Sequence, residues 1–363
     1  MRFVSLGYIK SDGFHDPQSW LERIKPYGEV LEALAKKHSV FSFEQIDFEG
    51  TYQLNGVEYH FIHLKNRKWP SSLHRQVKDL RPDVVIVHGL DSPFQVMQLR
   101  KSLGKNVTIL VQSHADRIPP GWRKRLQKIA DQSIDAYLFT SAGMATPWIN
   151  NKIIAGENKI KEVMMGASIF RVMNKDAATS VTKIQGYPVF LFVGRIDANK
   201  DPYTLIEAFS KFARTKSSVS LYLIIQNPEK KGEIQKLIEV NSMENNIFLV
   251  GKIPHAEMQA WLSSADFIIS TSHAEAFGMA VAEAMSCGCL PIVTNIPSFR
   301  KLTNNGDCGI LFEPGDVEQL VASLEKATQL NIEIERKKVL SYYNALLSAE
   351  AIAEQIYKAA TTL

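Results

Sequence analysis

Long hydrophobic runs are missing from this 363-residue sequence. The longest apolar stretch, YPVFLFVG at 187–194, is far shorter than the roughly 20 residues that a membrane-spanning helix needs. The amino terminus, MRFVSLGYIKSDG, lacks the basic start, the longer apolar stretch and the cleavage site of a signal peptide. We therefore expect neither a membrane span nor a cleaved leader.

Cysteine is scarce as well. Cys287, Cys289 and Cys308 match no zinc framework, and any single disulfide would leave one of them unpaired. We interpret them as small buried residues in a reducing compartment, and we expect a cytoplasmic protein.

A large charge of one sign is also absent, because the net charge is only +4. Residues 1–170 nevertheless carry 23 Lys and Arg against 17 Asp and Glu, whereas the remainder carries 19 against 21. The first half therefore favours an anionic partner, which could be a membrane surface, a phosphorylated acceptor or a nucleic acid. No stacked-aromatic or helix-turn-helix signature accompanies this charge, so we expect no nucleic acid.

What the sequence does contain is a regular alternation of short apolar bursts with amphipathic stretches. The predicted strands are 2–8, 58–64, 83–89, 107–113 and 135–141, then 188–194, 219–225, 246–251, 266–271 and 290–295. The predicted helices between them are 28–38, 92–104, 121–132, 202–216, 231–240, 256–265 and 278–288. Nearly continuous apolar strands separated by helices indicate parallel sheets covered on both faces.

The alternation of predicted strands and helices divides the chain into two halves of similar size. A polar stretch at 171–188 interrupts it, so we predict Rossmann-like domains at 1–172 and 173–345 with a cleft between them. No strand follows the helical stretch 333–360, and we predict that 346–363 packs back on the first domain.

Ligands of open parallel sheets bind beyond the carboxyl ends of the strands. Gly194 and Arg195 follow one predicted strand directly, and Lys200 comes five residues after Arg195. Two cations beside a glycine suit a pyrophosphate, although a solvated surface pair is the simpler alternative.

A second strand end, after 266–271, leads into HAEAFG and then a helix that Gly288 would end. Backbone N–H groups at the start of this helix attract an anion, so Glu275 must instead accept hydrogen bonds from hydroxyl groups. Glu283 lies about 8 Å from the helix start, measured along the helix axis. This is a plausible distance from the phosphate to the ribose of a bound nucleotide, and a carboxylate can accept from two ribose hydroxyls. The alternative is a carboxylate near the helix start and an exposed Glu283, but an unpaired acid among small apolar residues would be costly.

The loop GRIDANK, the motif EAFGMAVAEAM and the following GCLPIV together resemble the retaining glycosyltransferases of family 4. The resemblance covers nearly the whole chain, including RPDVVIVHG, ILVQSHAD, DAYLFTSAG and DCGILFEPGDVEQLVASL. It implies the GT-B architecture of two Rossmann-like domains, and transfer of a sugar from a UDP- or GDP-sugar to an acceptor hydroxyl. The setting it implies is synthesis of a bacterial surface polysaccharide or glycolipid.

The resemblance also implies roles for individual residues. Arg195 and Lys200 would neutralise the diphosphate, Glu275 would hold the transferred sugar, Glu283 would bind the ribose, and His114 would face the sugar from the other domain. Further donor contacts are implied for the backbone at Gly13, Gly194, Ala276, Phe277, Gly278 and Met279.

The implied mechanism is a front-face reaction that retains configuration, in which the leaving phosphate acts as the base. An Asp-x-Asp motif is missing, and because Arg195 and Lys200 would take the place of a metal, we expect neither a metal nor a cofactor.

The sequence departs from the family pattern in QNPEK after the strand 219–225, and in PSFRKL, where Arg300 and Lys301 replace the usual acid. Two other readings therefore stay open, namely a GT-B-type sugar-nucleotide epimerase and a non-catalytic relative that only binds a nucleotide sugar.

One segment bears on the acceptor, a glycan or a lipid-linked molecule. PPGWRKRLQKI places Trp122, Leu126 and Ile129 at helical spacing among four basic residues. Together with KNRKW at 65–69, it could form a basic face for peripheral membrane contact at the inner face of the membrane. The alternative is a surface helix whose apolar edge packs on the core.

Overall fold

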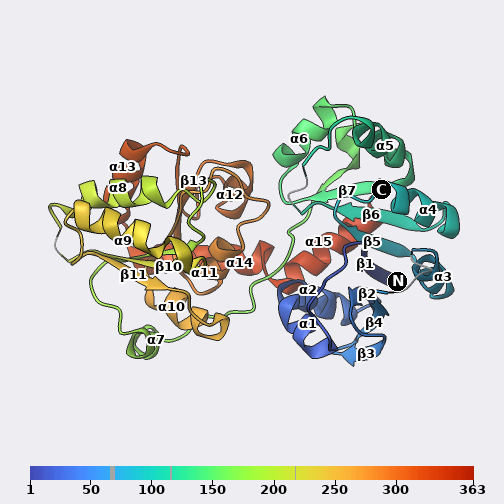
Figure 1. Ribbon diagram of the computed structural model, residues 1–363, viewed down its shortest axis with the longest axis horizontal. Coiled ribbons are helices and arrows are strands. Elements are labelled where there is room, and N and C mark those ends of the chain that lie inside the picture. The colour runs from blue at the N-terminus through green and yellow to red at the C-terminus, as the bar shows by residue number, and fades with distance from the viewer. Residues whose placement is uncertain (66–69, 115–116, 217) are drawn as a thin grey trace. The chain divides into compact units, whose positions relative to one another are not determined.

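The computed structural model describes residues 1–65, 70–114, 117–216 and 218–363 (Figure 1). The chain forms two compact units, one made of Met1–Ala167 with Ser348–Leu363 and the other of Ser168–Leu347. The predicted junctions, 172/173 and 345/346, lie a few residues from these boundaries. The basic segment 65–69 falls outside the described residues, apart from Lys65.

The first unit contains an eight-stranded sheet, counted over the described ranges, with the order β3-β4-β2-β1-β5-β6-β7-β8. All neighbours are parallel except β3 and β4. Val84–Val87 of β5 are fully buried, which explains the continuous apolar run of a strand covered on both faces. The strands are β1 Arg2–Gly7, β2 Ser39–Ile46, β3 Gly50–Leu54, β4 Val57–His63, β5 Val84–His88, β6 Thr108–Gln112, β7 Ala136–Phe139 and β8 Ile160–Glu162.

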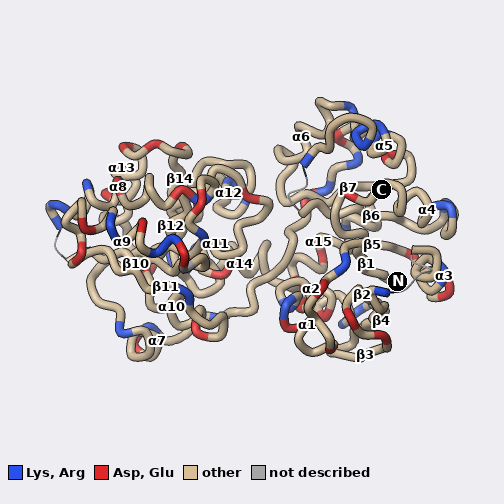
Figure 2. Tube along the Cα trace, in the orientation of Figure 1, with Lys and Arg blue, Asp and Glu red and all other residues tan. Residues whose placement is uncertain are grey.

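Helices connect these strands, and Lys and Arg gather over one of them, α5 (Figure 2). The helices of this unit are α1 Pro17–Arg23, α2 Lys25–Ala35, α3 Ser71–Asp79, α4 Pro93–Leu103, α5 Trp122–Ala130, α6 Ala142–Asn150 and α15 Ala349–Thr361. Within the described ranges, no helix is both long and apolar enough to cross a membrane.

The last helix of the chain, α15, packs on α2 of the first unit. Its apolar face, which includes Ile352 and Ile356, is fully buried. At its edge the ring of Tyr357 stacks on His38 with centroids 5.1 Å apart, and Lys36 pairs with Glu350 at 2.8 Å. Burial of this apolar face is what holds the returning segment on the first unit.

The second unit contains a six-stranded parallel sheet, again among the described residues, with the order β11-β10-β9-β12-β13-β14. Its strands are β9 Val189–Gly194, β10 Ser220–Ile225, β11 Ile247–Gly251, β12 Phe267–Ser270, β13 Leu290–Thr294 and β14 Ile310–Phe312. Its helices are α7 Lys175–Thr182, α8 Pro202–Ala213, α9 Lys231–Val240, α10 Met258–Ser264, α11 Met279–Ser286, α12 Pro297–Leu302, α13 Val317–Ala327 and α14 Ile332–Leu346. The predicted pair of parallel-sheet domains is thus confirmed.

The polar stretch 171–188 is not a simple linker, because it contains α7, which packs against α10. Asn174 caps this helix by accepting a hydrogen bond from the amide of Ala177 at 3.0 Å. The helical stretch 333–360 is likewise divided, since α14 belongs to the second unit and α15 to the first.

A buried histidine in the first unit makes its stability depend on pH. His74 is 4% exposed, its Nε2 lies 2.9 Å from the hydroxyl of Tyr8, and burial lowers its pKa to about 4. Because the unfolded chain binds this proton near pH 6.5, stability is complete above that pH and is lost as pH falls toward 4. From pH 6.5 to 5, we expect His74 to remove about 2 kcal/mol of the free energy of unfolding.

Urea denaturation of the wild type and of His74→Gln at both pH values measures this difference. The variant should show a shallower loss of stability on acidification. An unchanged pH dependence would contradict the role given to His74.

Candidate functional site

The end of β9 and the loop that follows it carry three of the predicted donor-binding residues, Gly194, Arg195 and Lys200. A residue that follows β10, Asn227, holds this loop from both sides. Its Oδ1 accepts from the amide of Ile196 at 2.7 Å, and its Nδ2 donates to the carbonyl of the same residue at 3.1 Å. Asn227 thus fixes the backbone next to Arg195.

Within this loop, Asp197 contacts the guanidinium of Arg195 and the backbone of Lys200. One carboxylate oxygen accepts from the amide of Lys200 at 2.8 Å, and the other lies 3.1 Å from Nε of Arg195. The Arg195 side chain is 61% exposed, so its guanidinium can reach a ligand in solvent.

The loop after β12 is tied to the first loop by backbone contacts. The side chain of Asn199 donates through Nδ2 to the carbonyl of Ala274 at 3.0 Å, and its Oδ1 accepts from the backbone amide of Ala274 at 3.1 Å. The hydroxyl of Thr271 donates to the carbonyl of Lys200 at 2.7 Å. Because β9 and β12 are neighbours in the sheet, both loops lie at the same edge.

Lys200 and Glu275 meet where these loops touch. Nζ of Lys200 lies 2.5 Å from Oε1 of Glu275, and the two side chains are 22% and 15% exposed. The sequence predicted hydroxyl groups as partners of Glu275, whereas here the carboxylate neutralises the nearby ammonium. A bound diphosphate would compete with Glu275 for Lys200.

The start of α11 adds backbone donors to the same edge. Gly278 caps this helix with a φ of +92° and no side-chain cap, and a Cβ there would lie 2.4 Å from the ring of Phe299. Only glycine fits this conformation and this close approach. The amides of Met279 and Ala280 have no partner within the helix, whereas that of Val281 already donates to the carbonyl of Gly278 at 2.9 Å. The first two amides can therefore bind an anion. A small pocket, lined by Lys200, Glu275 and Gly278, lies next to them.

Glu283 lies further along α11, where it is buried with 7% exposure. Its Oε1 lies 3.4 Å from Nε2 of His255, a residue of the short 3₁₀ turn His255–Glu257. The ring centroids of Phe170 and His255 are 4.9 Å apart. Sequence reasoning missed His255, since nothing in the motif indicates a partner that lies 28 positions away. The alternative of an exposed Glu283 is wrong.

In the first unit, the predicted residue His114 lies just beyond β6 and is exposed. Its Nε2 is 3.0 Å from Nδ1 of His88, at the end of β5, and Nε2 of His88 is 2.9 Å from the hydroxyl oxygen of Ser5 in β1. These three strands are neighbours in the sheet. The rings of Tyr27 and His88 are nearly perpendicular, with centroids 4.5 Å apart.

Burial, with a smaller contribution from His114, lowers the pKa of His88 well below its usual value. A neutral imidazole has one donor and one acceptor nitrogen, so His88 must donate to one of its two partners and accept from the other. His88 therefore fixes which nitrogen of His114 carries the proton, and sequence reasoning missed it.

Gly13, the other predicted contact in this unit, lies in a turn after β1 with a φ of +87°, and no atom lies within 4 Å of the place of its Cβ. The positive φ explains the glycine, and the space beside it is open.

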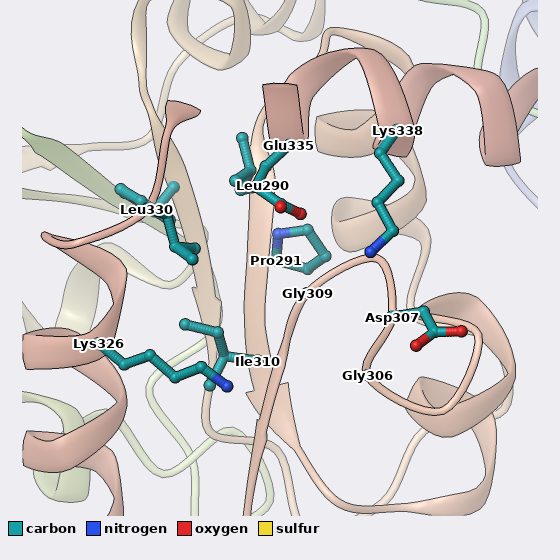
Figure 3. Close-up of a pocket in the computed structure, with 11 residues that line it drawn as sticks. Leu290, Pro291, Gly306, Asp307, Gly309, Ile310, Lys326, Leu330, Glu335 and Lys338 are labelled. Carbon is teal, nitrogen blue, oxygen red and sulfur yellow. The ribbon is translucent and has the colours of Figure 1, made fainter. Parts of the chain in front are cut away.

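A separate pocket of about 190 Å³ lies at the opposite edge of the second sheet. Its lining includes Phe267, Leu290 and Ile310, which begin β12, β13 and β14. Figure 3 shows Glu335 and Lys338 reaching into it from α14. Since ligands of parallel sheets bind at the carboxyl ends, this pocket is not part of the candidate site. Among the residues that the structure describes, no cluster of three or more metal-ligating side chains is found.

The family of glycosyl transferases group 1 matches residues 174–345, almost the whole of the second unit. Residues 174–345 belong to this family. The group 1 domain therefore contains both loops, α11 and His255.

Among curated relatives, the chain is 24% identical over 247 residues to the GDP-mannose:cellobiosyl-diphosphopolyprenol alpha-mannosyltransferase of Xanthomonas oryzae pv. oryzae, a match that covers 65% of this chain and 62% of the relative. It is 28% identical over 176 residues to the glycogen synthase of Mycobacterium tuberculosis, which covers 47% of this chain and 42% of that enzyme. The matches thus span less than two thirds of these relatives.

Solved structures match over the full length of the chain. Anabaena HepE in complex with UDP has a TM-score of 0.76 at 14% identity and covers 100% of both chains. The sucrose-phosphate synthase of Thermosynechococcus elongatus has a TM-score of 0.73 at 17% identity, with 99% of this chain and 98% of that chain covered. The fold around the group 1 domain is GT-B, as the resemblance implied.

Proposed function

We propose that the protein transfers a sugar from a nucleotide-sugar donor to an acceptor hydroxyl, with retention of configuration and without a metal ion or cofactor. One observation carries the proposal. The cations Arg195 and Lys200, the amides at the start of α11, and the buried Glu283 share the carboxyl edge of one parallel sheet in a group 1 domain.

The diphosphate of the donor would bind at Arg195, Lys200 and the first-turn amides around Gly278 and Met279. Cations held by Asp197 and by backbone contacts need little reorganisation, which favours stabilisation of the negative charge on the leaving diphosphate. When the diphosphate forms an ion pair with Lys200, the carboxylate of Glu275 becomes available to accept hydrogen bonds from hydroxyls of the transferred sugar. Glu283, with His255 beside it, would bind the ribose.

Retention is part of the proposal and follows from the family 4 resemblance. The leaving phosphate would take the proton of the acceptor hydroxyl, so no nucleophile of the protein is required. His114, whose proton position depends on His88, would be the group that the first unit adds to the reaction.

The acceptor in this proposal is a glycan or a lipid-linked molecule of a bacterial surface polysaccharide or glycolipid pathway. The name of the Xanthomonas relative, which includes a diphosphopolyprenol acceptor, supports a lipid-linked one. Cys287, Cys289 and Cys308 are buried and free, which suits a cytoplasmic location at the inner face of the membrane.

Two alternatives share the donor site. An epimerase would convert the nucleotide sugar itself, and a non-catalytic relative would bind it without turnover. Analysis of the products formed from radiolabelled UDP- and GDP-sugars with a lipid extract separates all three functions.

The direct test of the donor site is calorimetric titration with UDP and GDP, in EDTA and then with magnesium. We expect one nucleotide to bind with a micromolar dissociation constant, which corresponds to about −8 kcal/mol. Affinity should be the same in EDTA, because the cations already balance the diphosphate. Binding that appears only after magnesium is added would overturn the metal-independent site, and no binding of either nucleotide would overturn the donor assignment.

A further inference from the structure

The helix α5 of the first unit exposes two of its three large apolar side chains to solvent, and the third, Leu126, is half-buried. Trp122 is 69% exposed and Ile129 is 56% exposed. The residues that this helix buries are instead Gln127 and Ala130. The alternative considered for the sequence, an apolar edge packed on the core, is therefore wrong for Trp122 and Ile129.

The exposed apolar residues share one side of the helix with cations. Trp122, Arg125 and Ile129 are spaced at i, i+3 and i+7, so they form a row along one face. Lys128 lies beside this row, and the guanidinium of Arg123 lies 5.6 Å from the centre of the Trp122 ring. We call Trp122, Arg123, Lys124, Arg125, Lys128 and Ile129 the α5 surface.

The positive charge of the first half of the chain is concentrated around this helix. Residues 100–130 contain eight Lys and Arg and one acid, Asp116, whereas the rest of 1–170 contains 15 basic and 16 acidic residues. In Figure 2 the Lys and Arg positions gather over α5. The surface thus attracts an anionic partner, and its exposed apolar side chains favour one with an apolar interior.

A hollow of about 530 Å³ adjoins the α5 surface. Its lining includes Gly121, Lys124, Arg125, Lys128 and Asn151, and the ammonium of Lys124 donates to the side-chain oxygen of Asn151 at 2.7 Å. Three cations around one hollow suit a phosphate group.

We propose that the α5 surface binds an anionic lipid membrane, with α5 parallel to the membrane plane. Trp122 and Ile129 enter the boundary between headgroups and acyl chains, while Arg125 and Lys128 bind phosphate headgroups at the hollow. This role does not depend on the proposed sugar transfer, because it uses none of the residues assigned to that reaction.

Vesicle co-sedimentation of the full chain tests the proposal, with phosphatidylcholine alone and with phosphatidylcholine mixed with phosphatidylglycerol. We expect binding to the mixed vesicles only, and weaker binding as salt increases. Arg125→Glu/Lys128→Glu should lower the partition coefficient at least tenfold, since each cation near an anionic surface contributes about fivefold. Trp122→Ser/Ile129→Ser should also lower it and should abolish the blue shift of tryptophan emission.

Matched controls come from α9 of the second unit, where Lys231 and Lys236 are exposed and Val240 is 74% exposed. Lys231→Glu/Lys236→Glu and Val240→Ser should bind vesicles like the wild type. Equal loss in the α9 and α5 charge variants would mean that only net charge matters, and this would overturn the proposal. Wild-type binding in both α5 variants, or no binding of the wild type to mixed vesicles, would overturn it as well. Unchanged nucleotide titrations in the α5 variants show that the donor site is intact.

Discussion

Alanine in place of Lys200 is expected to lower the rate of sugar transfer by about 10²–10³-fold, the cost of removing one preorganised group that stabilises developing charge. Nucleoside diphosphate affinity should fall as well, because the ammonium would bind the diphosphate in both the ground state and the transition state. Steady-state kinetics and calorimetry measure the two effects on the same variant.

Lys211 provides the matched control, because it is a lysine of the same unit that also pairs with an acid, Glu318, at 2.8 Å. Lys211→Ala should leave transfer and nucleotide affinity unchanged. Wild-type turnover in Lys200→Ala would refute the assignment of Lys200 to the diphosphate.

Glutamine in place of Glu275 is expected to reduce transfer by about 10²-fold or more through the loss of a charge-assisted contact to the sugar. Nucleotide affinity should stay the same or rise, because Glu275 no longer competes for the ammonium of Lys200. A loss of transfer without a loss of nucleotide affinity distinguishes a sugar contact from a purely structural ion pair.

Glu318→Gln is the matched control for this variant, since it removes the acid of the Lys211 pair. Lost nucleotide affinity in Glu275→Gln would contradict the proposed exchange of partners. The double variant Lys200→Ala/Glu275→Gln should show a large non-additive term, because the two side chains are in direct contact.

The proximity of the candidate donor-site residues could be predicted in part from the sequence, because strand ends are visible in it. Apolar bursts located β9 and β12, and the rule that ligands bind at the carboxyl ends placed Arg195, Lys200 and Glu275 together. That β9 and β12 are neighbours, and that Lys200 pairs with Glu275, depends on sheet order and rotamers, which no local pattern encodes.

The supporting residues could not be predicted, because they act through long-range contacts of single side chains. Asn227 lies in QNPEK, which differs from the family pattern, yet it holds the backbone of Ile196 from both sides. His88 appeared only as one position within the predicted strand 83–89. His255 contacts Glu283 across 28 positions of sequence.

For α5 the pattern predicted the helix but left its orientation open. Trp122 and Ile129 lie on the solvent side because the helix buries Gln127 and Ala130 instead. Periodicity alone assigns an apolar face to the core, and it therefore gives the wrong orientation for a helix whose apolar face has another partner.

The return of α15 to the first unit also affects how the protein is made. During synthesis, Ser168–Leu347 is a continuous segment that can fold as soon as it leaves the ribosome, whereas the first unit must wait for Ser348–Leu363. Until then, the side of α2 that α15 covers is open to water and to other apolar chains. The first half of the protein to be translated is thus the last to be completed.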